Sequence, residues 1–265
     1  MVFLADASFS GDIFSLPSVI IAAHPDDEVL GLGGQLPRMN ATVIHVTDGS
    51  PVNLQYALAA GFATKEKYAG ARRREFLAAM SLAGIPGERC IPLDISDQAA
   101  SFCLVDLTRR VAGLLRELKP AVIFTHPYEG GHPDHDATCF AVHSAIKLLG
   151  FKRPDGPVLF EFTSYHAGPK GMETDFLPNS SCPVYLLNMG EEESALKDRM
   201  LDCFSTQKHF VKQFPRVAER IREAPHYDFV QPPHPGTLFY EPLDWGIDGT
   251  RWRLRAAEAQ HSLGI

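Results

Sequence analysis

The composition of this chain of 265 residues is that of a globular protein, with 45% hydrophobic and 22% charged residues. Its 32 acidic residues outnumber its 25 basic residues, which gives a net charge of −7. This balance argues against nucleic-acid and membrane-surface binding, because both require a basic face. No apolar run approaches the length of about 18 residues that a membrane span needs, so membrane insertion is not expected.

The five cysteines are widely spaced and form no C-x-x-C pair; they are Cys90, Cys103, Cys139, Cys182 and Cys203. An odd, scattered set is typical of a reducing compartment rather than of a disulfide framework. The N-terminus lacks a basic segment followed by a long apolar stretch, so we expect no signal peptide. Together these features predict a cytoplasmic location.

Strand-like and helix-like segments alternate along the first part of the chain, after a lead-in over residues 1–16 that we expect to be loose. The segments with the apolar pattern of short buried strands are 18–23, 42–47, 90–93 and 121–125. The segments with apolar residues at helical spacing are 64–83, 103–118 and about 134–149. This alternation predicts an α/β fold with a Rossmann-like, mostly parallel sheet and helices on both faces.

The C-terminal third is less regular, and we expect an irregular C-terminal extension of the sheet. The expected elements are strands over 157–163 and 183–188 and helices over 191–204 and about 207–223. Residues 224–245 contain five prolines and should be mostly extended or turn-like. Because no linker interrupts the chain, we predict one domain over residues 1–265, with a core of about 17–150 and an elaboration of about 151–265.

Two polar clusters follow two of the predicted strands. The first is HPDDE at residues 24–28, and the second is HPDHD at residues 132–136, after a pair of glycines. The carboxyl ends of parallel strands open onto a common crevice, so the two clusters can meet in space. Their histidines and carboxylates are ligands suited to zinc, and a catalytic zinc needs three protein ligands and one open position.

Each cluster also has a purely structural interpretation. Proline and acidic residues are favoured in the first turn of a helix, so either motif alone can mark a helix start. Two histidine-rich clusters, each following a strand, are better explained by a shared metal site. The metal site is therefore the hypothesis that we carry forward.

The sequence AHPDDE followed by GGHPDHDAT resembles the LmbE-like/PIG-L family of zinc-dependent N-acetylglucosaminyl deacetylases. The segment TDGS at 47–50 and the Arg72-x-x-Glu75 step add to the resemblance, which covers roughly residues 17–150. It implies a zinc-dependent hydrolase that removes an N-acetyl group from a glucosamine-type sugar conjugate and releases acetate. The implied partner is a small-molecule N-acetylated sugar conjugate, and a homo-oligomer is compatible with the sequence.

The resemblance also implies residue roles. It assigns one catalytic zinc ion to three ligands: His24, Asp27 and His135. Asp26 becomes the general base that takes a proton from water, and His132 stabilises the oxyanion or donates a proton. Asp134 is implied to orient a neighbouring histidine, and Arg72 to contact the substrate. Roles of this kind suit amide hydrolysis, which requires an activated nucleophile and a stabilised oxyanion.

Several features separate this chain from the family pattern and leave the substrate open. Residues 50–63 form an insertion-like loop expected on the rim of the site, and Phe204 stands three residues before Gln207, where relatives often carry histidine. The alternatives are zinc-dependent hydrolysis of another amide, a lactone or an ester, and a non-catalytic sugar- or metal-binding module. A nucleotide-binding oxidoreductase is disfavoured, since GLGG at 31–34 lacks the last glycine of the dinucleotide fingerprint.

The remaining histidines carry weaker signals. His45 lies within an apolar segment and is expected to be a buried structural residue. The histidines of the C-terminal part that have some chance of reaching the pocket are His166, His226 and His234.

Overall fold

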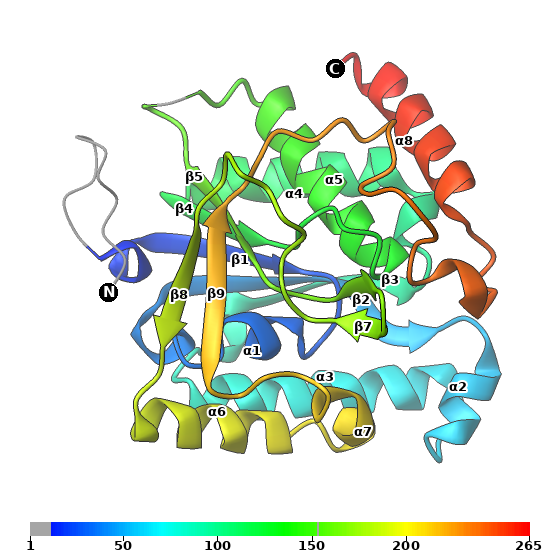
Figure 1. Ribbon diagram of the computed structural model, residues 1–265. Coiled ribbons are helices and arrows are strands. Elements are labelled where there is room, and N and C mark those ends of the chain that lie inside the picture. Colours follow the sequence, from blue (N-terminus) through cyan, green and yellow to red (C-terminus); the bar gives the residue numbers. More distant parts are fainter. Residues whose placement is uncertain (1–11, 153) are drawn as a thin grey trace.

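The computed structural model describes residues 12–152 and 154–265, and it has a seven-stranded sheet at its centre (Figure 1). The strands of this sheet, in spatial order, are β3 (Cys90–Asp97), β2 (Asn40–Pro51), β1 (Pro17–Ala22), β4 (Val122–Thr125), β5 (Val158–Phe162), β9 (Ala218–Glu223) and β8 (Val184–Asn188). The first five are parallel, whereas β9 and β8 are antiparallel additions. The predicted Rossmann-like, mostly parallel sheet is therefore confirmed. A separate hairpin pairs β6 (His166–Gly168) with β7 (Gly171–Glu173).

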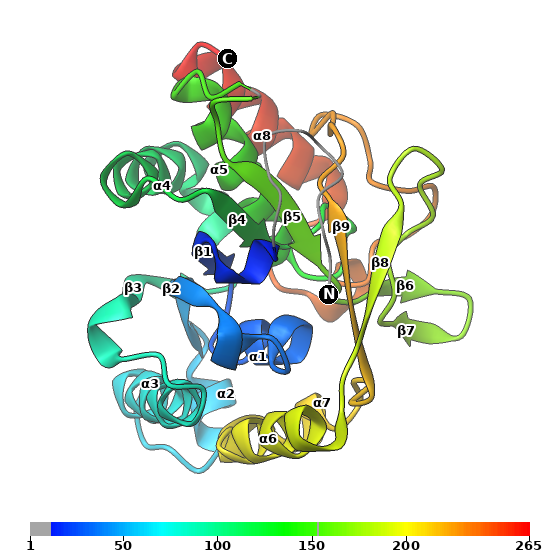
Figure 2. The same cartoon turned by 90° about the vertical axis from the view of Figure 1, so that its left-hand side faces the viewer.

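Helices cover both faces of the sheet, as Figure 2 shows with the sheet seen from its end. The helices below the sheet in that view are α1 (Asp27–Leu32), α2 (Leu54–Ala59), α3 (Lys65–Leu82), α6 (Glu191–Asp202) and α7 (Lys208–Val211). The helices above it are α4 (Leu104–Leu118), α5 (Pro133–Leu148) and α8 (Gly249–Leu263).

Two apolar cores result from this layering, one on each face. Side chains of β1 alternate between them: Ile20 packs with α3 and α6, whereas Ile21 packs with α4, α5 and α8. Successive residues of a strand point to opposite faces, so a strand covered on both sides is apolar along its whole length. This explains why the strands appear in the sequence as continuous apolar runs.

The predicted strands and helices between residues 18 and 149 are confirmed, with small shifts at their ends. One difference matters for the site, because β3 extends to Asp97 instead of ending near residue 93. The sequence does not reveal this extension, because Pro92 and Asp94 interrupt the strand pattern. In the structure, the register between β2 and β3 shifts in the same region.

The helix predicted over 207–223 is wrong. The chain forms only the four-residue α7 there, because Pro215 lacks the amide proton that a continuing helix needs. Residues 218–223 then form β9, which pairs with both β5 and β8. Charged Glu219 and Arg222 are buried in this strand, so its sequence lacks the apolar pattern that marks a central strand.

Three other segments differ from expectation. Residues 1–11, on which the signal-peptide prediction rests, lie outside the described residues. Phe14, near the end of the lead-in, is fully buried, so this part of the lead-in is not loose as expected. The 50–63 loop contains α2, which Asn53 caps by accepting a hydrogen bond from the amide of Gln55. The C-terminal extension ends in α8, a helix that we did not predict.

Across residues 12–152 and 154–265, no helix is long and apolar enough to cross a membrane.

A buried ion pair fastens the antiparallel edge of the sheet to the helix that carries the first motif. Lys197 Nζ on α6 lies 2.7 Å from Glu219 Oε1 on β9 and donates to the backbone oxygen of Leu30 at 2.8 Å. Glu219 Oε1 also accepts the amide of Gly34 at 2.8 Å. Both charged side chains are almost completely buried, so each depends on the other for its stability.

We expect Lys197→Met to lower the free energy of unfolding by about 3–5 kcal/mol, because it leaves a buried carboxylate without its cation. Chemical denaturation monitored by circular dichroism measures this change. The matched control is Arg216→Met, which removes the partly exposed pair with Asp198 and should cost less than about 1 kcal/mol. If both substitutions changed the free energy of unfolding equally, the Lys197–Glu219 pair would contribute no more than a surface ion pair.

Candidate metal and active site

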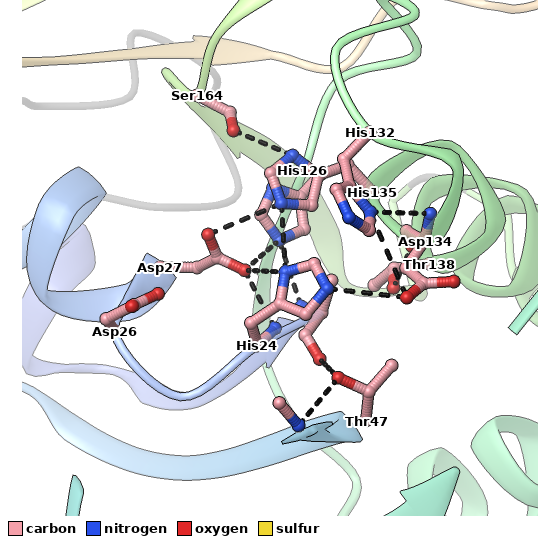
Figure 3. A network of polar contacts seen from close by, with 12 residues as sticks. His24, Asp26, Asp27, Thr47, His126, His132, Asp134, His135, Thr138 and Ser164 are labelled. Carbon is pink, nitrogen blue, oxygen red and sulfur yellow. Dashed lines mark hydrogen bonds and ion pairs between the residues drawn. The ribbon is translucent and has the colours of Figure 1, made fainter. Parts of the chain in front are cut away.

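The predicted site residues meet in one cavity at the carboxyl ends of the parallel strands. The cavity has a volume of about 290 Å³, close to the lower limit for small-molecule sites. Its lining includes all but one of the predicted residues, namely His24, Asp26, Asp27, Arg72, His132 and His135. Asp134, the exception, lies beside His24, with its Oδ2 3.4 Å from His24 Nε2 (Figure 3). The topology thus brings together two motifs that are 108 positions apart.

The three predicted metal ligands converge on one another. His24 Nδ1 lies 3.2 Å from Asp27 Oδ2 and 3.2 Å from His135 Nε2, and His135 Nε2 lies 3.4 Å from Asp27 Oδ1. In a tetrahedral zinc site with bonds of about 2.0–2.2 Å, neighbouring ligand atoms lie about 3.3–3.6 Å apart. The donor types suit a divalent metal such as zinc, and the three separations lie close to this spacing, with His24 facing one oxygen of Asp27 and His135 facing the other.

Two further side chains of the cluster escaped the sequence analysis. His126 Nε2 lies 3.3 Å from Asp27 Oδ2, and its ring stacks on that of His135 at 4.0 Å. Asp97 Oδ1 lies 3.3 Å from His24 Nε2 without hydrogen-bond geometry. A signal for His126 existed, since it directly follows a predicted strand, just as His24 does. Asp97 had none, because β3 was expected to end before it.

The electrostatics of the cluster reflect many ionisable groups in a small buried volume. Burial alone would raise the pKa of Asp27, but His135 and His126 hold that pKa well below its usual value. Burial opposes a charge on His24 as well, yet Asp97, Asp134 and Asp27 raise its pKa. Positive charge at the point where the predicted ligands meet would therefore stabilise the ionised carboxylates.

Asp26, the predicted base, is held in an unusual backbone conformation. Its φ angle is 134°, which costs a residue with a side chain about 1–3 kcal/mol. Arg72 Nη2 donates to Asp26 Oδ2 at 3.1 Å and to the backbone oxygen of Pro25 at 2.7 Å, and Nη1 donates to the oxygen of Gly49 at 2.9 Å. Burial raises the pKa of Asp26, and Arg72 opposes that rise. Arg72 therefore lines the cavity, and its terminal nitrogens hold the Asp26 carboxylate and the backbone of Pro25 and Gly49 in place.

Asp134 and His132 lie at the start of α5, where local hydrogen bonds fix them. Asp134 accepts the amides of Gln98 and Ala100 at 2.6 and 3.0 Å, and its Oδ2 lies 3.4 Å from His24 Nε2. His132 Nδ1 accepts the amide of Asp134 at 3.1 Å, so in the neutral ring Nε2 carries the proton. Burial and the neighbouring His24 lower the pKa of His132, which favours this neutral form.

Outer contacts orient the remaining ligand and complete the cavity. Ser164 Oγ lies 2.9 Å from His135 Nδ1, which leaves His135 Nε2 free to face the other ligands. The C-terminal half supplies four lining side chains that the sequence did not reveal: Tyr165, Gln207, Phe210 and Trp245. Pro51 and Tyr56 also line the cavity, which places the 50–63 loop on its rim as expected.

The structure places the other histidines that the sequence analysis singled out. His45 is buried and lies 2.8 Å from Glu28 Oε2, so its structural role is confirmed. His166, His226 and His234 are absent from the lining of the described cavity.

Comparison with known proteins places this geometry in a family context. Residues 19–146 match the family model described as PIG-L: GlcNAc-PI de-N-acetylase. This matched segment, which we call the PIG-L region, contains every predicted site residue, whereas Tyr165 and Trp245 lie outside it.

Individual relatives extend the comparison. A 1D-myo-inositol 2-acetamido-2-deoxy-alpha-D-glucopyranoside deacetylase from Catenulispora acidiphila is 30% identical in an alignment of length 157 that covers 50% of this chain and 51% of that protein. The chain thus matches about half the length of this curated relative. Among solved structures, an A40926 pseudoaglycone deacetylase aligns with a TM-score of 0.63 and 20% identity, covering 81% of this chain and 99% of that one.

The fold also occurs with another chemistry. The 4-carboxy-2-hydroxymuconate hydratase from Pseudomonas putida aligns with a TM-score of 0.57 and 17% identity, covering 80% of this chain and 98% of that one. At such identity the likeness concerns the fold alone, so the reaction must be argued from the site residues.

We expect the protein to bind one equivalent of zinc, and His135→Ala to weaken binding by more than about 100-fold, since changes to outer contacts alone cost about 10–100-fold. Competition with a chromophoric chelator measures the affinity. His209→Ala, which removes an exposed histidine outside the cavity, should leave the affinity unchanged. Equal affinity of the His135→Ala and His209→Ala variants would remove His135 from the ligand set.

Proposed function

We propose that this protein is a zinc-dependent hydrolase that removes an N-acetyl group from a glucosamine-type sugar conjugate and releases acetate. The observation that carries the proposal is the convergence of His24, Asp27 and His135 beside a positioned carboxylate, Asp26, within one cavity. The PIG-L match and the deacetylase relatives support the same reaction.

His24, Asp27 and His135 would hold one zinc ion. When bound, zinc acts as a Lewis acid that polarises a carbonyl group and lowers the pKa of water. Histidine nitrogens and one carboxylate oxygen form a common ligand set for catalytic zinc. Ser164 would keep the His135 ring in the orientation that presents Nε2 to the metal.

Asp26 would serve as the general base and then as the general acid. It accepts a proton from the attacking water and returns it to the nitrogen as the carbon–nitrogen bond breaks, so that acetate and a free amine result. Arg72 supports this role because it fixes both the carboxylate and the adjacent backbone of Asp26. We therefore propose that Arg72 positions Asp26. Because Arg72 also lines the cavity, the predicted contact with the substrate remains part of the proposal.

His132 would stabilise the negative charge that develops on the carbonyl oxygen. Its Nδ1 is occupied by the amide of Asp134, so its Nε2–H is the donor available to the cavity. Asp134 would hold His24 in place from behind, through the contact between its Oδ2 and His24 Nε2.

The domain and location follow from separate observations. We propose that residues 1–265 act as a single domain, because Gln207 and Trp245 of the elaboration complete the cavity of the PIG-L region. We infer a cytoplasmic location from the five free cysteines, which suit a reducing compartment.

A second candidate is hydrolysis of another amide, a lactone or an ester at the same metal site. It is favoured by the shared fold of the hydratase, which shows that this architecture accommodates different substrates. A panel of N-acetylated sugars, other amides, lactones and esters, assayed with zinc-loaded and chelator-stripped protein, separates the two. Metal-dependent acetate release from the sugars supports the first proposal, and turnover confined to the other compounds supports the second.

We expect Asp26→Asn to bind zinc as the wild type does but to reduce turnover by about 10²–10⁴-fold, the usual contribution of a general base. Metal analysis and acetate release measured on the same preparation test both parts. If the variant kept near wild-type turnover, Asp26 could not be the base.

A further inference from the structure

Two aromatic side chains from distant parts of the sequence meet at the cavity. Tyr56 comes from α2 and Trp245 from the segment before α8, and Trp245 Nε1 donates to Tyr56 Oη at 2.8 Å. Both side chains line the cavity, and Tyr56 retains 39% of its surface exposed. The pair therefore links α2 to the segment before α8 at the cavity through a hydrogen bond between two lining side chains.

This pair lies next to the reacting groups. The Trp245 ring centroid is 4.7 Å from that of His132, the predicted oxyanion-stabilising residue. Phe210 and Tyr165 also line the cavity and pack against each other, and we call the four side chains the aromatic wall of the cavity: Tyr56, Trp245, Tyr165 and Phe210. A group attached to the sugar would meet this wall as it leaves the metal site.

The backbone holds Trp245 in a defined turn. Asp244 on one side has φ 51° and Gly246 on the other has φ 75°, so two left-handed residues flank the tryptophan. A residue with a side chain adopts this conformation only when its surroundings hold it there. The position of Trp245 is thus built into the turn.

The charges of the cavity restrict what can bind beside the aromatic wall. Among the described residues that line the cavity, Arg72 is the sole arginine or lysine, and its terminal nitrogens are engaged by three groups of the protein itself. Three carboxylates also line the cavity: Asp26, Asp27 and Asp97. Away from the proposed metal position, a phosphate or carboxylate beside the aromatic side chains would therefore find no lining arginine or lysine whose terminal nitrogens are not already hydrogen-bonded to the protein.

We propose that Tyr56 and Trp245 form a subsite for an uncharged aglycone that presents a flat apolar face, such as an aryl group. This inference rests on the proposed deacetylase function and specifies its substrate class. Aromatic side chains stack on flat apolar groups and bury a large area, which favours such aglycones over small or charged ones. The subsite would also distinguish this enzyme from its inositol-conjugate relative, whose aglycone is a polyol.

Three N-acetylglucosamine glycosides test the proposal: methyl, phenyl and 4-carboxyphenyl. With zinc-loaded wild type, we expect kcat/KM for the phenyl glycoside to exceed that for the methyl glycoside by about tenfold or more. The 4-carboxyphenyl glycoside has the same ring but a negative charge, and it should lose most of this advantage. Equal kcat/KM values for the methyl and phenyl glycosides would overturn the subsite.

Variants locate the preference on the two residues. Trp245→Ala should reduce the phenyl-to-methyl ratio to near one, whereas Tyr56→Phe, which keeps the ring and loses the hydrogen bond, should reduce it only in part. Leu254→Ala removes an exposed apolar side chain on α8 outside the cavity and should leave the ratio unchanged. A ratio that survives Trp245→Ala would overturn the assignment.

A binding measurement separates this inference from the proposed function. Zinc-loaded Asp26→Asn protein should bind the phenyl glycoside more tightly than the methyl glycoside by calorimetry, even without turnover. If acetate were released equally from both glycosides, the subsite would fail and the deacetylase function would stand. If no glycoside were hydrolysed and the binding preference persisted, the function would fail and the subsite would stand. Equal binding of both glycosides would overturn the subsite on its own.

Discussion

The structure depends on one electrostatic constraint, the burial of several carboxylates in a single small volume. Asp27, Asp97 and Asp134 all lie within 3.4 Å of the His24 ring nitrogens, and Asp26 lies beside them. Removing such charges from water is unfavourable unless cations and hydrogen bonds compensate. Histidines and Arg72 supply part of that compensation, and the proposed divalent metal would supply more, so the groups that stabilise the site are those assigned to the proposed chemistry.

The fold meets this constraint through topology. Parallel strands bring the ends of β1, β3 and β4 to one edge, and the start of α5 adds His132 and His135 to the same point. The antiparallel edge contributes in another way: the buried pair of Lys197 and Glu219 fastens it to α1, which begins at Asp27. A strand that carries no predicted site residue thereby holds in place the helix that begins at Asp27.

The sequence was informative where chemistry and local pattern coincide. HPDDE directly follows an apolar strand and HPDHD follows the loop after another, and each motif holds its candidate ligands within one helical turn, so these residues and their meeting point could be predicted. Asp97 and Trp245 could not, because no local pattern marks a strand interrupted by Pro92 or a turn set by Asp244 and Gly246. The helix predicted over 207–223 failed because β9 buries Glu219 and Arg222, whose partners come from distant segments.

The central claim is that the two motifs share one metal ion. An anomalous difference map from crystals of the zinc-loaded protein, with data on both sides of the zinc absorption edge, tests it most directly. The account predicts one peak at about 2.0–2.2 Å from His24 Nδ1, the Asp27 carboxylate and His135 Nε2. Other donor groups in the same cluster offer alternative positions, among them His24 with Asp97, His132 and Asp134, and Asp27 with His126 and His135. A peak there, or no peak in the cavity, would contradict the account.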